Sequence, residues 1–111
     1  MEVAPGVFVS QTATDEWEFD PEVNGDLHML CSADGLQAGM SRFAGNEAGK
    51  PVTFTPEHRE TLLVLEGEAR VEIGGGPALE LRPGVIASIP AGTETTWYIT
   101  PPFKEFWVIA G

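Results

Sequence analysis

The sequence is short of several residue types, and each shortage excludes a class of protein. It has one cysteine, Cys31, so an intrachain disulfide is impossible, and a thiol in the apolar run 27–31 is expected to be buried and inert. Only six residues are lysine or arginine, against seventeen aspartates and glutamates, which gives a formal net charge of −11. Nucleic acids and anionic membranes bind clusters of basic side chains, and the sequence has no such cluster. We therefore expect neither as a partner.

Long hydrophobic runs are also lacking. No apolar run approaches the roughly 18 residues that a membrane-spanning helix needs. The N-terminus has no basic segment followed by an apolar core, which a secretory signal would require. These features favour an acidic, soluble and cytoplasmic protein.

What the sequence does contain is short apolar runs separated by glycine and proline. Runs at 60–66, 68–73 and 85–89 are rich in β-branched residues and are bounded by turn residues. The 13 glycines and 9 prolines are spread along the chain, as expected for many strands joined by turns. The length of 111 residues suits one domain. The pattern predicts an all-β barrel with little or no helix, in which 1–25 is an N-terminal strap and loop and 26–111 is the barrel.

The two ends of the chain carry further strand signals. Residues 26–32 and 36–44 read as a hairpin turned at Asp34-Gly35, because Asp-Gly tolerates the positive φ of a tight turn. Residues 94–100 and 104–110 read as the last two strands, separated by two prolines.

The acidic segment 12–20 is open to two interpretations. Its Trp17 and Phe19 are two residues apart, so they can pack together on the barrel exterior or on a partner subunit. Alternatively, Thr14 caps a single helical turn.

Two stretches resemble the paired motifs of the cupin superfamily. The second half of the first motif resembles the spacing here of Glu60 and Gly67, which are separated by six residues. The start of the second motif resembles the spacing of Gly84, Pro90 and Gly92, with five residues and then one residue between them. The resemblance implies a single-domain cupin (RmlC-like) jelly-roll β-barrel across 1–111. It also implies a homodimer, because small cupins usually dimerise.

A closer resemblance is to the (S)-ureidoglycine aminohydrolase-like subgroup of small cupins. It rests on Trp97 after the Pro-x-Gly turn, on Pro102 and Lys104 before the last aromatic strand, and on the early hairpin around 32–39. Trp107 alternates with Phe103 in that last strand, and we expect it on the dimer face.

The resemblance also implies a metal site that this sequence does not match. Metal-binding cupins carry two histidines before the glutamate of the first motif, where this chain has only threonine, phenylalanine and proline at 53–56. A third histidine of the motif corresponds to Thr95 here, so Glu60 alone has a suitable side chain. A transition metal needs three or four donors. We therefore expect no metal cofactor; the alternative is a divalent transition metal held by Glu60 and His58, which share a face if the strand is continuous.

Glu60 opens an apolar strand, so its carboxylate needs a partner if it points into the barrel. Arg42 and Lys104 are the cations available in neighbouring strands, and the result is either a structural ion pair or the polar end of a ligand pocket. Thr95 and Trp97 share a face by strand alternation, and an inward Trp97 would form a wall of such a pocket.

Three functions follow from these observations. The first is the binding of a small polar molecule in a metal-free barrel by Glu60, His58, Arg42, Thr95, Trp97 and Lys104. The second is a metal-dependent enzyme resembling ureidoglycine aminohydrolase, which the missing ligands disfavour. The third is a dimeric scaffold with a filled barrel. We expect no catalytic residue, and favour the first function.

Overall fold

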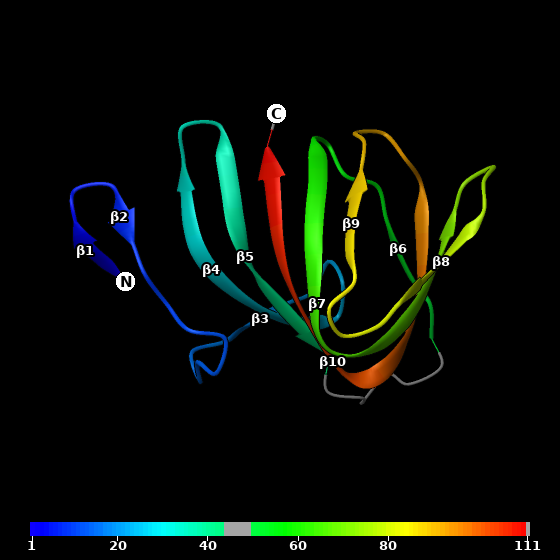
Figure 1. Ribbon diagram of the computed structural model, residues 1–111, viewed down its shortest axis with the longest axis horizontal. Helices are drawn as coiled ribbons and strands as arrows, with labels where there is room; N and C mark the ends of the chain where they lie inside the picture. Colours follow the sequence, from blue (N-terminus) through cyan, green and yellow to red (C-terminus); the bar gives the residue numbers. More distant parts are fainter. Residues whose placement is uncertain (44–49, 111) are drawn as a thin grey trace.

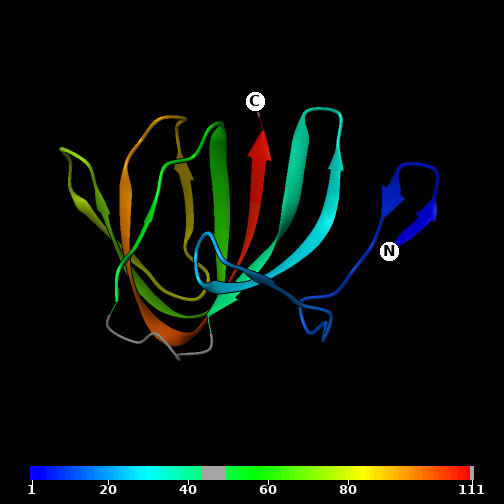
Figure 2. The ribbon, with the colours of Figure 1, turned by 180° about the vertical axis from the view of Figure 1, so that it is seen from behind.

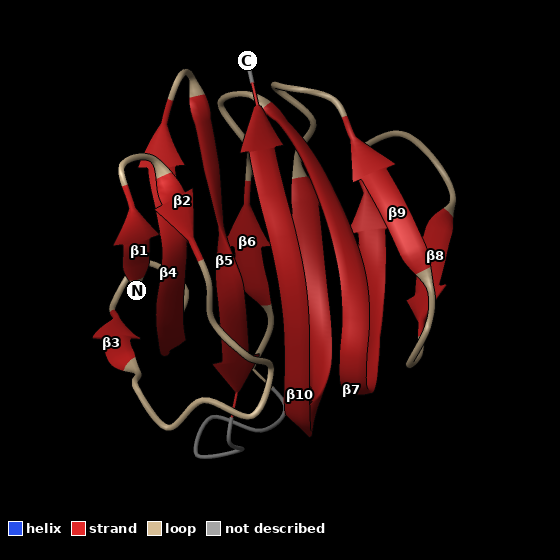
Figure 3. Ribbon diagram, turned by 60° about the vertical axis from the view of Figure 1, so that its left-hand side comes forward, coloured by secondary structure: helices blue, strands red, loops and turns tan. Residues whose placement is uncertain are grey.

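A computed structural model describes residues 1–43 and 50–110, and the fold within these ranges is all-β, as the sequence predicts. The described residues form strands and loops and contain no helix (Figure 3). No helix in this part of the chain is therefore long and apolar enough to cross a membrane. In chain order the strands are β1 (Glu2–Ala4), β2 (Val7–Phe8), β3 (Glu18–Asp20), β4 (Gly25–Ala33), β5 (Leu36–Phe43), β6 (Val52–Phe54), β7 (Arg59–Ile73), β8 (Ala78–Leu81), β9 (Ile86–Ile89) and β10 (Thr95–Ala110).

Two long strands, β7 and β10, run antiparallel to each other through the whole barrel (Figure 1). The C-terminal half of β10 pairs with β5, which continues the sheet through β4 to β3. The N-terminal end of β10 pairs with β6, while β7 pairs with β8 and β9 along its other edge. The two long strands therefore belong to both walls of the barrel and join them.

The sequence predicts a break in each of these strands, and both breaks prove to be bends. β7 continues through Gly67, and β10 continues through Pro101 and Pro102, with a shift of register between Thr100 and Lys104. Gly67 has a φ of 82°, and a Cβ there would collide with the backbone oxygen of Pro102. Glycine is needed at this position because the two bending strands approach each other closely.

The predicted early hairpin is confirmed, although Ala44 and most of the following loop lie outside the described residues. Strands β4 and β5 pair across Asp34 and Gly35, whose φ angles are 57° and 75°. Two consecutive positive φ values are typical of the tight turns that join twisted antiparallel strands. Cys31, in β4, is half-buried.

The hydrophobic core fills one end of the barrel interior. Alternate residues of β7 point inward, so Leu62, Val64 and Val71 are at most 2% exposed. Phe103 of β10 packs with them and contacts the ring of Trp97, with ring centroids 6.4 Å apart. The other end of the interior is not filled and forms the cavity described below.

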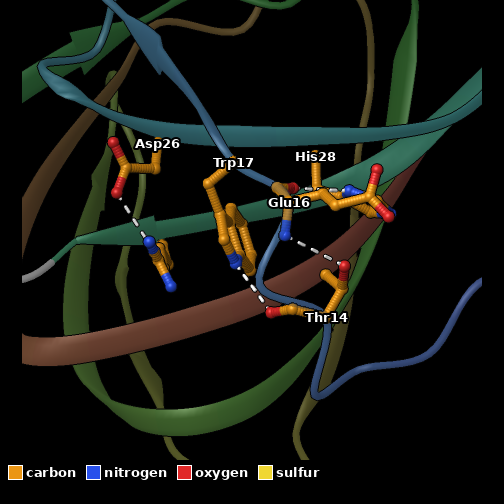
Figure 4. A network of polar contacts seen from close by, with 6 residues as sticks. Thr14, Glu16, Trp17, Asp26 and His28 are labelled. Atoms are coloured by element: carbon orange, nitrogen blue, oxygen red, sulfur yellow. Dashed lines mark hydrogen bonds and ion pairs between the residues drawn. The ribbon is translucent and has the colours of Figure 1, made fainter.

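The N-terminal segment crosses the outer face of the barrel before it enters β3 (Figure 3). The hairpin of β1 and β2 stands apart from the barrel in the ribbon views (Figures 1 and 2). Trp17 docks on the outer face, as one of the two interpretations predicts, but Phe19 does not, since it is 61% exposed. Thr14 forms no helical turn; its hydroxyl accepts a hydrogen bond from the Glu16 N–H at 3.2 Å (Figure 4).

Candidate functional site

The barrel interior holds a cavity of about 420 Å³. Its buried end is lined by Glu60, Glu105, Trp97 and Trp107, and its rim carries exposed side chains such as Glu22. A volume of a few hundred Å³ is typical of pockets for small ligands, roughly 300–1,000 Å³. The remaining lining residues are half-buried or exposed and come from β3 to β6, from β10 and from the loop after β3: Asp20, Val23, Leu27, Met29, Gln37, Ser41, Phe43, Val52, Phe54, Ile99 and Ile109.

Glu60 points into this cavity from the start of β7. Its side chain is 5% exposed, and its Oε1 has no hydrogen-bond partner among the described residues. Burial disfavours the charged carboxylate and raises the pKa of Glu60 from 4.5 to about 7. The group is therefore close to half protonated at neutral pH.

A second carboxyl, Glu105 of β10, lies in the same cavity and is 6% exposed. Its Oε2 also lacks a partner within the described part of the chain. Burial, and then the negative charge of Glu60, raise the pKa of Glu105 well above its ordinary value. We did not predict Glu105 from the sequence. The available signal was its alternation with Phe103 and Trp107, two large apolar residues that favour the inside of a barrel.

The two tryptophans of the cavity have their ring N–H groups occupied by the protein itself. Trp97 donates to Thr95 Oγ1 at 3.0 Å, and Thr95 in turn donates to the backbone oxygen of Phe54. Trp107 donates to Ser41 Oγ at 2.9 Å. Neither indole is thus bonded to a carboxyl group. Trp97 is inward, which the sequence left open, and it forms part of the cavity wall. The dimer-face position predicted for Trp107 is wrong, since this residue is 7% exposed and lines the cavity.

Arg42 and Lys104 are not brought to Glu60. Arg42 Nε forms an ion pair with Asp26 at 3.0 Å, and its guanidinium carbon lies 4.3 Å from the centre of the Trp17 ring. Lys104 Nζ donates to the backbone oxygen of Thr12 at 2.8 Å. Both cations therefore hold the N-terminal segment on the outside of the barrel.

His28 of β4 completes this outer contact. Its Nδ1 lies 2.8 Å from the Glu16 backbone oxygen, and its Nε2 lies 2.7 Å from Ser10 Oγ. In Figure 4, Trp17 lies between Asp26 on one side and His28 on the other. Two of the six residues proposed from the sequence as ligand-binding, Arg42 and Lys104, thus serve this contact instead of lining the cavity.

The residues present do not fit a cupin metal centre. His58 is exposed and precedes β7, which begins at Arg59, so strand alternation does not carry His58 to the face of Glu60. Thr95, at the position of a motif histidine, is bonded to Phe54 and Trp97. Across residues 1–43 and 50–110, no three histidine, cysteine, aspartate or glutamate side chains are grouped so that they could hold a metal ion.

Comparison with known proteins agrees with this architecture. No curated protein matches the sequence. Among solved structures, a protein from Salmonella typhimurium LT2 named ethanolamine utilization protein Q superposes with a TM-score of 0.77, at 21% identity over 99% of this chain and 89% of that one. An RmlC-like cupin protein from Desulfovibrio desulfuricans gives a TM-score of 0.68, at 18% identity over 92% and 95% of the two chains. The Clostridium difficile EutQ protein gives 0.66, at 17% identity over 82% and 65%.

At these identities the solved structures establish the fold, an all-β cupin jelly roll. The family follows from the sequence itself, because the model of the EutQ-like cupin domain matches residues 42–106, more than half of the chain. The matched range includes Glu60, Glu105 and part of the core around Phe103. The chain therefore belongs to the EutQ-like cupin domain family.

Proposed function

We propose that the protein binds a small organic molecule in the barrel cavity without a cupin metal centre. The observation that carries the proposal is the pair of buried carboxyl groups, Glu60 and Glu105, each with one oxygen that no described residue bonds. A buried polar atom without a partner is costly, and in native proteins it is usually bonded by a ligand or water. The cavity has room for such a molecule beside the two carboxyl groups.

The cavity also weighs against a purely structural barrel. A filled barrel would place apolar side chains at the inward positions, and two of these positions hold glutamate instead. Replacing buried ionisable groups by apolar ones is often neutral or stabilising, so a scaffold has no need to keep them. Binding explains their presence and filling does not.

A second candidate activity is that of the ureidoglycine aminohydrolase-like cupins. Trp97 supports it, since it stands in the cavity where a planar amide could stack. Lys104 does not support it, since its ammonium group is bonded outside the barrel. Ureides therefore belong among the ligands to be tested, and the metal-dependent reaction is the less favoured alternative.

The three tryptophans allow a direct test by nuclear magnetic resonance. Ring N–H signals of Trp97 and Trp107 report on the cavity, and that of Trp17 reports on the outer face. The protein is titrated with a mixed set of small neutral, anionic and cationic molecules that includes ureides and ethanolamine, the compound in the name of the Salmonella protein. We expect at least one compound to shift the two cavity signals in a saturable manner while Trp17 is unaffected.

Two matched variants locate the binding. Val52→Phe places a larger side chain in the cavity and should abolish the shifts. Thr53→Phe, on the next residue of β6, adds the same ring at an exposed position and should leave the shifts unchanged. If no compound shifts the cavity signals, or if Val52→Phe binds as well as the wild type, the proposed function is wrong.

The homodimer predicted from the resemblance also remains a proposal. The β1–β2 hairpin supports it, because Met1, Val3 and Val7 are all more than half exposed. An apolar hairpin that stands apart from its own barrel is suited to packing on a second copy. Light scattering of the purified chain, with and without residues 1–9, measures the mass directly.

A further inference from the structure

The ionisable side chains that line the cavity are all carboxylic acids. They are Asp20, Glu22, Glu60 and Glu105, and no lysine, arginine or histidine among the described residues joins them. We propose that the ligand of this cavity is a small organic ammonium ion, held by Glu60 and Glu105 and enclosed by Trp97 and Trp107. The proposal rests on the binding function proposed above and names its ligand class.

Within the described residues, no lysine, arginine or histidine lines the cavity to balance its carboxyl groups. Glu60 and Glu105 are at least 94% buried, and one oxygen of each lacks a hydrogen-bond donor. The two cations expected from the sequence, Arg42 and Lys104, are bonded to Asp26 and to the Thr12 backbone oxygen on the outer face. An ammonium group on the ligand would supply both the missing charge and the missing N–H donors.

The aromatic and apolar side chains that line the cavity suit an organic cation. The ring N–H groups of Trp97 and Trp107 are bonded to Thr95 and Ser41, so what the indoles offer a ligand is their π surface. Ammonium groups are attracted to indole rings, and most strongly where water is excluded. The neighbouring apolar side chains would cover the hydrocarbon part of the ligand, and they include Leu27, Phe43, Ile99 and Ile109.

The cavity suits an organic cation better than a metal ion. A bare divalent ion needs several oxygen or nitrogen donors in fixed geometry. Glu60 and Glu105 are only two, and in the described part of the chain no third suitable side chain completes a metal-binding group with them. Apolar walls also bind a hydrated ion poorly, because they cannot replace its water ligands.

Burial itself is compatible with the charge that the proposal requires. It raises the pKa of Glu60 to about 7, so the protonated and ionised forms of this carboxyl differ little in free energy near neutrality. A bound ammonium ion favours the ionised form of both carboxyl groups, and Asp20 and Glu22 at the cavity add negative charge of the same sign.

The test compares ligands that match in shape and differ in charge. Wild-type protein is titrated with n-butylammonium chloride and with 1-butanol, and the ring N–H signals of Trp97 and Trp107 are followed. We expect saturable shifts with the ammonium ion. The affinity for the alcohol should be lower by about tenfold or more, because the alcohol cannot form a charge-assisted hydrogen bond. In Glu105→Gln, the affinity for the ammonium ion should fall about tenfold or more, while Glu68→Gln, an exposed change on β7, should bind like the wild type.

Each other outcome overturns the inference. Equal affinity for the alcohol, or neutral compounds that bind in a Val52→Phe-sensitive manner while ammonium ions do not, would refute the ligand class and leave the binding function standing. No binding by any compound would refute both. Magnesium or zinc chloride that reproduces the shifts and displaces n-butylammonium would reassign the carboxyl groups to a metal ion. If Glu105→Gln fails to fold, the comparison of the two ligands on wild-type protein still decides.

Discussion

Replacing Glu60 by glutamine should make the protein's stability less dependent on pH. In the unfolded chain the carboxyl titrates at its ordinary pKa of 4.5, and in the folded barrel burial raises this pKa to about 7. Below pH 4.5 the group is protonated in both states. As the pH rises from about 4.5 to 7, the unfolded chain loses the proton first, so the free energy of unfolding falls; above 7 both states are ionised and the loss is complete.

The magnitude follows from the same two values. Each tenfold change in proton affinity corresponds to about 1.4 kcal/mol, so the ionised Glu60 costs the folded state about 3 kcal/mol. About 2 kcal/mol of this loss falls between roughly pH 5.5 and pH 8, a window that lies above the calculated isoelectric point of about 4.3. Glutamine has nearly the same shape and no charge, so the variant escapes the loss.

The measurement is urea unfolding of both proteins across this window. We expect the free energy of unfolding of Glu60→Gln to gain about 2 kcal/mol on the wild type between about pH 5.5 and pH 8. Glu105, whose pKa burial also raises, remains in the variant, so some pH dependence persists. The double variant with Glu105→Gln should be flatter still.

Glu68→Gln is the matched control, because Glu68 is exposed on the same strand. The free energy of unfolding of Glu68→Gln should change with pH by the same amount as that of the wild type. If the free energy of unfolding of Glu60→Gln also changes with pH by that amount, then Glu60 is not desolvated in the folded protein and the description of the cavity is wrong.

Three further predictions concern other parts of the molecule. Gly67→Ala should destabilise the barrel by roughly 2 kcal/mol or more in urea unfolding. Gly75 also has a positive φ but has open space around it, so Gly75→Ala should destabilise the protein by only about 1 kcal/mol. Equal losses of stability would show that the two strands do not approach closely at Gly67. Trp17→Ala should speed amide exchange at 10–17 and leave cavity binding unchanged, since the ring packs only on the outer face. The affinity for n-butylammonium should rise about tenfold between roughly pH 6 and pH 8 as Glu60 ionises, and a constant affinity would contradict this role.

Local sequence signals were sufficient for the turns and for much of the inner face. Asp34-Gly35 predicts its hairpin because the required φ angles are a property of these residues. Strand alternation places Trp97 on the same face as Thr95, and both residues are buried. Signals of this kind depend on neighbours in the chain and need no knowledge of distant contacts.

The face of the last strand was harder to assign, because alternation gives two faces and does not say which is inside. Lys104 and Trp107 lie on opposite faces, and the prediction chose the wrong one for both. Phe103 and Trp107 lie on the same face of this strand, and two large apolar rings on one face indicate that this face is the buried one. With that choice, Glu105 follows as an inward residue.

The continuity of β7 and β10 could not be read locally. Gly67 and the two prolines at 101 and 102 are turn signals by themselves. The sequence does not reveal that Gly67 of β7 lies opposite the prolines of β10 in a long antiparallel pair. The pairing on both sides of the bend holds the strands together through it.

The central place of β10 has a consequence for how the chain is made. Of the described strands it is the last to leave the ribosome, yet β5, β6 and β7 all pair with it. Until residues 95–110 have emerged, each of these three strands has an open edge, and no strand joins β3, β4 and β5 to β7. Folding of the barrel during synthesis therefore waits for β10, and until then the nascent chain exposes sheet edges that are open to aggregation.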